Sequence, residues 1–265
     1  MIVFERLGGW GLGNSLFQIA TTMGIAKNNN TSFAFPDICN FKRVRYDINS
    51  TFKHQLPWVN LKELSNVKRW GIGDIKYVEP PLFNTDTIID GFFQSEKYFK
   101  HIREEILELF DIKDNIKDYL KEKYKDLLEQ KSCTLHVRRG DYFTAKELRV
   151  LDVDYYKSAI THFDSDTHYV IFSDDIEWCK NNFDFLERKT FIEEKNDLIE
   201  MYLMSFFKNN IIANSTYSWW GSWLGNNNKV VMPNPETTWF SDIYYEEHKH
   251  NKGFNDLICE NWITI

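Results

Sequence analysis

The sequence has few cysteines and lacks long apolar runs. Among 265 residues there are four cysteines, Cys39, Cys133, Cys179 and Cys259, without a C-x-x-C pair. This spacing does not fit a structural zinc site or a disulfide-rich scaffold, so we interpret the cysteines as reduced core residues. No apolar run approaches the roughly 18 residues that cross a bilayer, and no signal-peptide pattern is present. We expect a cytoplasmic protein with at most peripheral membrane contact.

Basic residues are in the minority. The chain contains 32 Lys and Arg against 39 Asp and Glu, a net charge of −7. Nucleic-acid binding depends on clustered cations that neutralise phosphates, so we expect no nucleic-acid partner. The remaining composition, 43% hydrophobic and 27% charged, is typical of a globular protein of one or two domains.

Short apolar segments alternate with amphipathic segments along most of the chain. Strands are expected at residues 1–4, 32–35, 87–90, 134–137, 169–172, 211–213 and 230–232 and near 191, and helices after 14, over 98–110 and 116–128, and from about 154, 175, 196 and 218. Residues 37–85 show only weak periodicity. The alternation predicts an α/β fold with parallel sheets, divided into domains 1–131 and 132–265, with ligands at the carboxyl ends of the strands.

The most informative local pattern is the segment from His136 to Tyr142, which follows an expected strand. Alternate residues of an extended chain share a face, so His136 and Arg138 should point together and Arg139 away from them. One guanidinium group can donate two parallel hydrogen bonds to phosphate oxygens, so we expect Arg138 to contact a diphosphate. Arg139 should pair with Asp141 or another carboxylate. The spacing is explained equally well if both arginines are structural and form ion pairs with carboxylates.

Two further polar clusters follow expected strands. The cluster at residues 172–175 contains Ser173 and the carboxylates of Asp174 and Asp175, whose oxygens suit a ribose or a base edge. Asn214, Ser215 and Thr216 combine hydroxyl groups with the start of an expected helix, an arrangement that binds anions. For both clusters, capping of the following helix is the alternative interpretation.

The glycines near the amino terminus suggest a rival function. Residues 9–14 contain two glycines of a dinucleotide-binding fingerprint, but Asn14 replaces the third, which leaves an NAD-dependent oxidoreductase as a distant alternative. Asp-x-Asp patterns occur at residues 152–154 and 164–166. Neither follows a strand and the first precedes a helix, so we interpret the first as a helix cap and expect no metal site.

Taken together and in this order, the clusters resemble the alpha-1,2-fucosyltransferases of glycosyltransferase family 11. The matching stretches are residues 11–14, 17–18, 91–99, 136–142, 154–156, 172–175, 178, 214–220 and 260–262. Only residues 37–85 carry little of the resemblance.

This resemblance implies a GT-B-like fold of two Rossmann-like domains facing across a cleft, with residues 132–265 holding GDP-fucose and residues 1–131 on the acceptor side. It also implies an inverting, metal-independent transfer of fucose to the 2-hydroxyl of a terminal beta-galactose on a glycan. The residues implied by position are Arg138 at the beta-phosphate, His136, Ser173 and Asp175 near the guanosine, Asn214, Ser215 and Thr216 at the diphosphate, and Asn14 near the reacting centre.

The resemblance leaves the general base and the acceptor open. Asp141 is the nearest carboxylate to the arginines, but pairing with Arg139 would make it a poor base; Glu147 or late loss of the proton without a base are alternatives. Ser15 stands where the family usually has Gln, which affects the acceptor side. The alternative functions are a transferase using another nucleotide sugar or linkage and a noncatalytic nucleotide- or glycan-binding protein.

Overall fold

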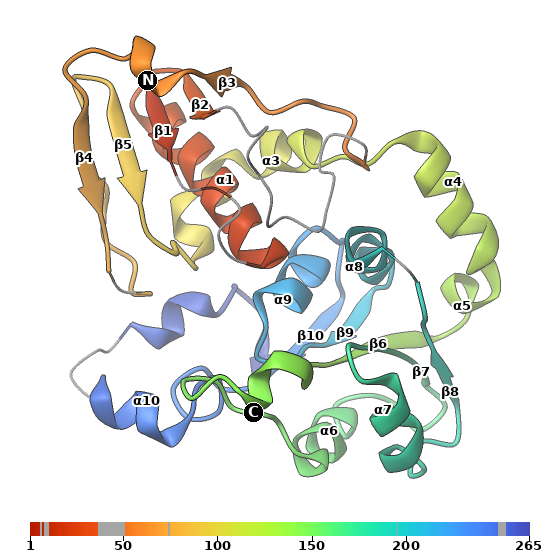
Figure 1. The fold of residues 1–265 in the computed structure, drawn as a ribbon. Helices are drawn as coiled ribbons and strands as arrows, with labels where there is room; N and C mark the ends of the chain where they lie inside the picture. Colours follow the sequence, from red (N-terminus) through yellow and green to blue (C-terminus); the bar gives the residue numbers. More distant parts are fainter. Residues whose placement is uncertain (6, 8–10, 37–50, 74, 195, 249–252) are drawn as a thin grey trace. The chain divides into compact units, whose positions relative to one another are not determined.

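The computed structural model describes all residues except 6, 8–10, 37–50, 74, 195 and 249–252, and it divides into two compact units, residues 1–113 and 114–265 (Figure 1). This division precedes the expected boundary at residue 131. Helices α4 (Asp114–Lys123) and α5 (Lys125–Glu129) therefore group with the second unit. There, Lys123 and the Tyr124 hydroxyl both donate to Glu194 Oε1, at 2.7 and 2.5 Å.

The first unit contains a parallel sheet with the described strand order β3-β2-β1-β5-β4. Its strands are β1 (Ile2–Phe4), β2 (Phe33–Pro36), β3 (Trp58–Val59), β4 (Lys68–Gly71) and β5 (Thr87–Asp90), and helix α1 (Leu12–Asn28) follows β1. The predictions of strands at 1–4, 32–35 and 87–90 and of the first helix are confirmed.

The strands β3 and β4 lie in the region where the sequence predicted little regular structure. Both are edge strands of the first sheet, and the side chains of β4 are mostly exposed, so neither shows an apolar alternation. Backbone pairing with β5 forms β4 instead. Residues 37–50, which share that region, lie outside the described residues.

Two expected helices are interrupted. The stripe over 98–110 begins with 3-10 turns, η3 (Glu96–Tyr98) and η4 (Lys100–Ile102), before α3 (Arg103–Leu109). The stripe over 116–128 divides into α4 and α5 at Tyr124. The apolar spacing located the buried faces correctly, because Ile106, Phe110 and Leu120 are fully buried, but it did not reveal the breaks.

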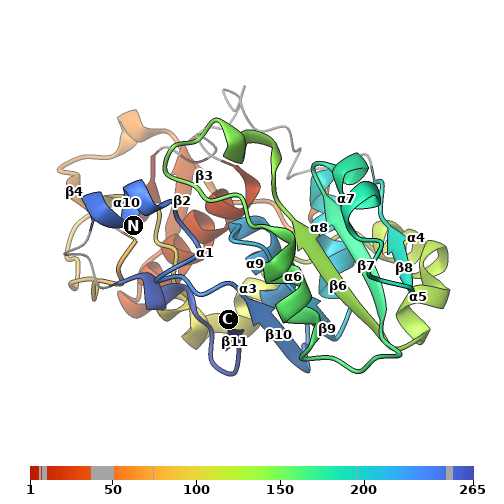
Figure 2. The ribbon, with the colours of Figure 1, turned by 90° about the horizontal axis from the view of Figure 1, so that it is seen from below.

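The second unit contains a parallel sheet with the described order β11-β10-β9-β6-β7-β8. Its strands are β6 (Ser132–Val137), β7 (His168–Ser173), β8 (Lys189–Phe191), β9 (Asn209–Ile211), β10 (Lys229–Met232) and β11 (Ile263–Thr264). Its further helices are α6 (Val153–Ile160), α7 (Ile176–Asn182), α8 (Asp197–Ser205), α9 (Thr216–Trp223) and α10 (Asp242–Glu247), with 3-10 turns at Gly140–Phe143 (η5) and Phe254–Leu257 (η6) (Figure 2). The expected alternation is confirmed; α10 and β11 were not anticipated.

The side chains of strand β6 alternate between the two faces of this sheet. Leu135 and Val137 belong to a buried cluster that also contains Tyr156 of α6 and Phe183, next to α7. His136 points to the opposite face, where its ring lies 5.3 Å from that of Tyr217 in α9. The three described cysteines lie buried, as expected, and Cys39 is outside the described residues.

The strand order also locates the positions where ligands are expected. In the second sheet the chain runs outward from β6 through β7 to β8 and then returns to the other side of β6 with β9. In the first sheet the same reversal lies between β1 and β5. The carboxyl ends of strands at such reversals form crevices that bind ligands in open α/β sheets.

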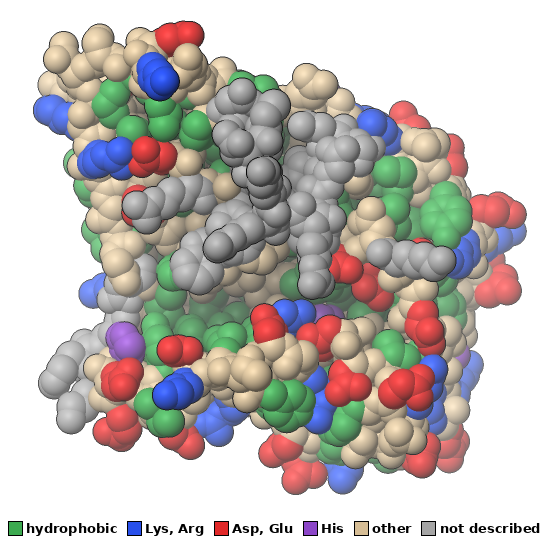
Figure 3. Space-filling view, viewed as in Figure 1, with side chains coloured by type: hydrophobic (Ala, Val, Ile, Leu, Met, Phe, Trp, Pro, Cys, Tyr) green, Lys and Arg blue, Asp and Glu red, His purple; other side chains and the backbone are tan. Residues whose placement is uncertain are grey.

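On the face shown in Figure 3, Lys and Arg side chains are interspersed with Asp and Glu side chains. Within the described ranges, none of the helices combines the length and apolar character that crossing a membrane requires.

Candidate functional site

The carboxyl ends of β6, β7 and β9 bring together the polar clusters that the sequence singled out in the second unit. The segment after β6 carries Arg138, and β7 ends at Ser173. The segment after β9 carries Asn214 and leads into α9, whose N-cap is Ser215. These segments flank the reversal between β6 and β9, so the second unit presents one continuous polar edge.

The Arg138 guanidinium lies between two carboxylates at this edge. Its Nη2 donates to Asp141 Oδ1 at 2.7 Å, and its Nη1 lies 3.1 Å from Asp174 Oδ2. Although burial opposes the charge, the carboxylates of Asp174 and Asp141 raise the pKa of Arg138 above its ordinary value. Arg138 is therefore held as a positioned, permanent cation, which suits a diphosphate.

Asp174, a carboxylate of the cluster at residues 172–175, was not expected to contact the arginines, and Gly140 explains how it reaches them. The Asp174 carboxylate accepts a hydrogen bond from the Arg139 backbone N–H at 2.9 Å and also holds Arg138. A Cβ atom on Gly140 would lie only 2.5 Å from Asp174 Oδ2. The glycine between the arginines and Asp141 thus permits the close approach of β7's end to the segment after β6.

Arg139 points away from Arg138, as the alternation predicts. Its guanidinium lies 3.7 Å from the centroid of the Trp178 ring, and its Nε lies 3.2 Å from Asp175 Oδ2. The expected carboxylate partner is therefore Asp175. Asp141, the other partner considered for Arg139, pairs with Arg138 instead, because the turn at η5 brings Asp141 to the arginine three positions before it.

Three buried polar atoms at this edge have no hydrogen-bond partner among the described residues. They are Arg138 Nε, His136 Nδ1 and Asn214 Oδ1. Burial, with a smaller contribution from the Arg138 charge, lowers the pKa of His136 to about 3, so its ring is neutral at physiological pH. Buried donors and acceptors without partners are costly, so these atoms indicate a polar ligand or ordered water at the site.

The segment after β9 is held by hydrogen bonds from several directions. Asn214 Nδ2 donates to the carbonyls of Arg149 and Trp239, both at 2.7 Å. Tyr142 donates to the Asn214 carbonyl at 2.8 Å, which ties this segment to the arginine segment. Ser215 Oγ accepts from the Tyr217 N–H at 3.3 Å. The capping interpretation is therefore confirmed for Ser215, and the contacts of Asn214, Ser215 and Thr216 with a diphosphate stay predictions.

Ser173 and Asp175 also have structural roles. Ser173 Oγ accepts a hydrogen bond from the Asp175 N–H at 2.9 Å. Asp175 Oδ1 accepts from the Trp178 N–H at 3.1 Å, which makes Asp175 the N-cap of α7, and its Oδ2 faces Arg139. The contacts of Ser173 and Asp175 with a nucleoside therefore stay predictions.

Glu200 is a residue of this unit that sequence reasoning missed. Burial raises its pKa to about 8, and the nearby carboxylates of Asp197 and Glu194 add to the shift, while Tyr217 opposes it through a hydrogen bond. In the sequence, Glu200 resembles an ordinary acidic residue in the first turn of a helix, where the dipole favours it. Only the packing of α8 on α9 places it beside Tyr217, whose ring contacts His136.

The Asp-x-Asp patterns do not gather metal ligands. Asp152 Oδ1 accepts from the Tyr155 N–H at 3.0 Å and caps α6, as expected. Asp164 and Asp166 both pair with Lys131. In the described part of the chain, no group of three or more His, Cys, Asp or Glu side chains is arranged to hold a metal ion.

Asn14, the remaining expected site residue, belongs to the first unit. It lies in the first turn of α1, and its Oδ1 accepts a hydrogen bond from Gln94 Nε2 at 2.8 Å. Ser15, where the family usually has Gln, is buried, and its Oγ contacts the Gly11 carbonyl at 3.4 Å. Residues 9 and 10, the start of the glycine pattern, lie outside the described residues.

Known structures with a similar fold include fucosyltransferases. The structure of the NodZ alpha-1,6-fucosyltransferase soaked with GDP-fucose matches 84% of this chain and 92% of its own, with a TM-score of 0.56 and 12% identity. A structure of POFUT1 in complex with GDP matches 87% of this chain and 97% of its own, with a TM-score of 0.54 and 10% identity. The predicted α/β fold of the GT-B type is thereby confirmed.

Sequence comparison identifies the family. The chain is 34% identical over 191 residues to the O-antigen biosynthesis glycosyltransferase WbnK and 35% identical over 186 residues to an alpha-1,2-colitosyltransferase, both from Escherichia coli. These matches cover 66% of this chain but only 59% and 61% of the relatives, so the chain spans about three fifths of their length. The family model for glycosyl transferase family 11 matches residues 14–265, and the chain therefore belongs to that family.

Proposed function

We propose that this protein transfers fucose from GDP-fucose to the 2-hydroxyl of a terminal beta-galactose, forming an alpha-1,2 linkage with inversion. The observation that carries the proposal is the Arg138 guanidinium, fixed by Asp141 and Asp174 with its buried Nε unpartnered among the described residues. Family membership supplies the reaction class. The similar NodZ structure was soaked with GDP-fucose and the POFUT1 structure is in complex with GDP, which supports this donor.

The site stabilises the charge that develops on the leaving group. The galactose oxygen attacks C1 of fucose while the bond from C1 to the phosphate oxygen breaks, and the electron pair of that bond passes to the beta-phosphate of GDP. Arg138 and the N–H groups at the start of α9 stabilise this charge without reorganising. His136, neutral and close to Tyr217, and the side chains of Ser173 and Asp175 border the nucleoside.

The proton of the attacking hydroxyl needs an acceptor. Asp141, which is 66% exposed, is our candidate within the arginine segment, and it must leave its ion pair with Arg138, 2.7 Å away, to accept the proton, because pairing with an arginine makes it a poor base. Glu147, an exposed carboxylate further along the same loop, is the alternative. Because guanidinium and N–H donors can carry the charge of the diphosphate, we propose that the reaction requires no divalent metal.

A second donor is favoured by a specific observation. One of the relatives with about a third of its residues identical is a colitosyltransferase, so a GDP-linked colitose is the competing donor. The two sugars would be distinguished by contacts with the sugar ring rather than by the diphosphate site. A donor panel therefore tests the identity of the sugar independently of Arg138.

The experiment that tests the proposal is release of GDP from GDP-fucose in EDTA, with lactose and N-acetyllactosamine as acceptors and product analysis for the linkage. Acceptor-dependent release with an alpha-1,2 product supports the proposal. Tight GDP binding without release from any donor indicates the noncatalytic alternative, and release that requires manganese contradicts metal independence.

Replacement of Arg138 tests the role of the guanidinium. We expect Arg138→Gln to lower kcat by about 100- to 1,000-fold, because one preorganised donor to a developing anion contributes about that factor. Arg188→Gln removes an exposed arginine of the same unit and serves as the matched control. Wild-type kcat in Arg138→Gln would refute the assignment.

A further inference from the structure

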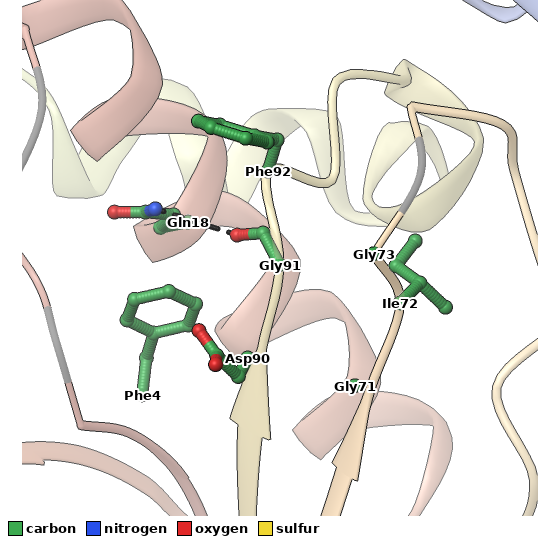
Figure 4. Close-up of a pocket in the computed structure, with 8 residues that line it drawn as sticks. All are labelled: Phe4, Gln18, Gly71, Ile72, Gly73, Asp90, Gly91 and Phe92. Atoms are coloured by element: carbon green, nitrogen blue, oxygen red, sulfur yellow. Dashed lines mark hydrogen bonds between the residues drawn. The ribbon is translucent and has the colours of Figure 1, made fainter. Parts of the chain in front are cut away.

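No cation comparable to Arg138 is among the described residues that line the pocket of the first unit. This pocket has a volume of about 330 Å³ and lies at the reversal between β1 and β5, where Gln18 of α1 and Asp90 at the end of β5 are among its lining residues (Figure 4). A carboxylate that is not balanced by a cation repels a diphosphate. The contacts of Arg138 in the second unit therefore decide how a diphosphate is bound.

Asp174 is a firmly held partner of Arg138. Its side chain is 25% exposed, and its Oδ2 lies 3.1 Å from Arg138 Nη1. Its Oδ1 accepts a second hydrogen bond, at 2.9 Å, from the backbone N–H of Arg139. Gly140 lies so close that a Cβ atom there would be 2.5 Å from Asp174 Oδ2. Asp174 is thus fixed by two hydrogen-bonding groups and by close packing against the backbone.

Asp141 is held by a single contact. Its side chain is 66% exposed, and its Oδ1 accepts from Arg138 Nη2 at 2.7 Å. The described residues give its carboxylate no further hydrogen bond or ion pair. An exposed ion pair contributes little free energy, because water solvates both groups when they separate. Asp141 can therefore leave Arg138 at a low cost.

The edge of the guanidinium that Asp141 contacts is only half used. The group is planar, and its Nε–H and one N–H of Nη2 point the same way, as a two-pronged donor. Nη2 donates to Asp141, whereas the buried Nε has no hydrogen-bond partner among the described residues. A phosphate group offers an oxygen to each of these donors. Phosphate is therefore the better ligand for this edge once Asp141 has left it.

We infer that the beta-phosphate of GDP displaces Asp141 from Arg138, while Asp174 stays in place as the positioning residue of the guanidinium. The inference rests on the proposed function for the identity of the diphosphate. Without the donor, Asp141 occupies the edge that the phosphate will take. With the donor bound, Asp141 is free of the pairing that makes it a poor base. The carboxylate therefore becomes available to the attacking hydroxyl only after the donor has bound.

Calorimetric measurement of GDP affinity tests the inference, because the two carboxylates should have opposite effects. Asp141→Asn removes the competitor and should strengthen GDP binding about twofold to fivefold, the range expected for an exposed ion pair. Asp174→Asn should weaken GDP binding about tenfold, because Arg138 loses the charged hydrogen-bond partner that positions it. Asp126→Asn, which removes an exposed carboxylate from α5, should bind GDP as the wild type does.

GMP is the matched ligand, since it lacks the beta-phosphate. The affinity for GMP should be the same in the wild type, Asp141→Asn and Asp174→Asn. An equal loss of GDP and GMP binding in Asp174→Asn would indicate a merely structural role and reject Asp174 as a positioning residue. An equal gain for both nucleotides in Asp141→Asn would indicate a general effect of charge and overturn the displacement.

The outcomes separate this inference from the proposed function. Unchanged or weaker GDP binding in Asp141→Asn overturns the inference, even if fucose is transferred normally. Because Asp141 is exposed, its variant decides the displacement whether or not Asp174→Asn folds. The expected GDP affinities without transfer from any donor support the inference and reject the proposed function. Absence of GDP binding to the wild-type protein overturns both.

Discussion

At the scale of single residues, the site of the second unit depends on charges held at fixed positions. Arg138 is bracketed by Asp141 and Asp174, whereas Arg139 is stacked on Trp178 and paired with Asp175. Two adjacent arginines thus have different tasks, which explains why exchanging them for lysine would not be conservative: a lysine cannot supply the planar fork of donors.

Glu200 provides a pH-dependent prediction. Its pKa is about 8 in the folded protein against 4.5 when unperturbed, so the folded state binds an additional proton between these values and stability falls as pH rises through this window. Glu200→Gln removes this contribution. In chemical denaturation, we compare the free energy of unfolding of the variant with that of the wild type. The difference, variant minus wild type, should be larger at about pH 9 than at about pH 5.

The control for Glu200 is Glu122→Gln, an exposed carboxylate on α4 of the same unit. Its difference from the wild type should not change over this pH range. If the difference in unfolding free energy between Glu200→Gln and the wild type also stays constant over this pH range, folding does not raise the pKa of Glu200.

At the scale of elements, helix caps account for several of the polar residues that could be mistaken for ligands. Asp152 caps α6, Asp175 caps α7, Asn196 caps α8 and Ser215 caps α9. In a parallel sheet, helices start next to the carboxyl ends of strands, so caps and ligand-binding groups occupy the same edge. A polar residue there requires its contacts before a role can be assigned.

Asp152 tests this distinction. We expect Asp152→Ala to lower the free energy of unfolding by about 1 kcal/mol, because the cap of α6 is lost, and Asp152→Ser to retain most of the stability. Transferase activity of both variants in EDTA should match the wild type. A selective loss of activity with restoration by manganese would instead identify Asp152 as a metal ligand.

At the scale of the whole molecule, the two units present two separate ligand positions. Each unit has its own parallel sheet with one reversal of strand order, and polar groups cluster at both reversals. The position in the second unit is cationic, because Arg138 lies there between Asp141 and Asp174, and under the proposed function it takes the anionic donor.

Hydrogen exchange measured by mass spectrometry can separate the two positions. GDP alone should slow amide exchange in residues 138–142, 173–175 and 214–217, because ligand binding suppresses local opening, and should leave residues 87–92 unchanged. Protection of residues 87–92 by GDP would contradict the assignment of the donor to the second unit.

The sequence by itself was sufficient for most of the buried strands and amphipathic helices and for the alternation within the arginine segment. The buried strands and amphipathic helices carry apolar periodicities that arise from burial on one face, so most were predicted with their approximate bounds. The alternation of His136, Arg138 and Arg139 follows from the geometry of an extended chain. The exposed edge strand β4 lacks such a pattern and was missed.

The tertiary structure alone decided which partners these side chains have. Asp174 contacts Arg138 because β7 lies beside β6 and Gly140 leaves room, and Glu200 becomes partly buried because α8 packs on α9. Gln18 and Asp90, 72 positions apart in the chain, line one pocket because α1 packs against β1 and β1 pairs with β5. Burial and pairing between distant segments arise only on folding, and local periodicity contains no record of them.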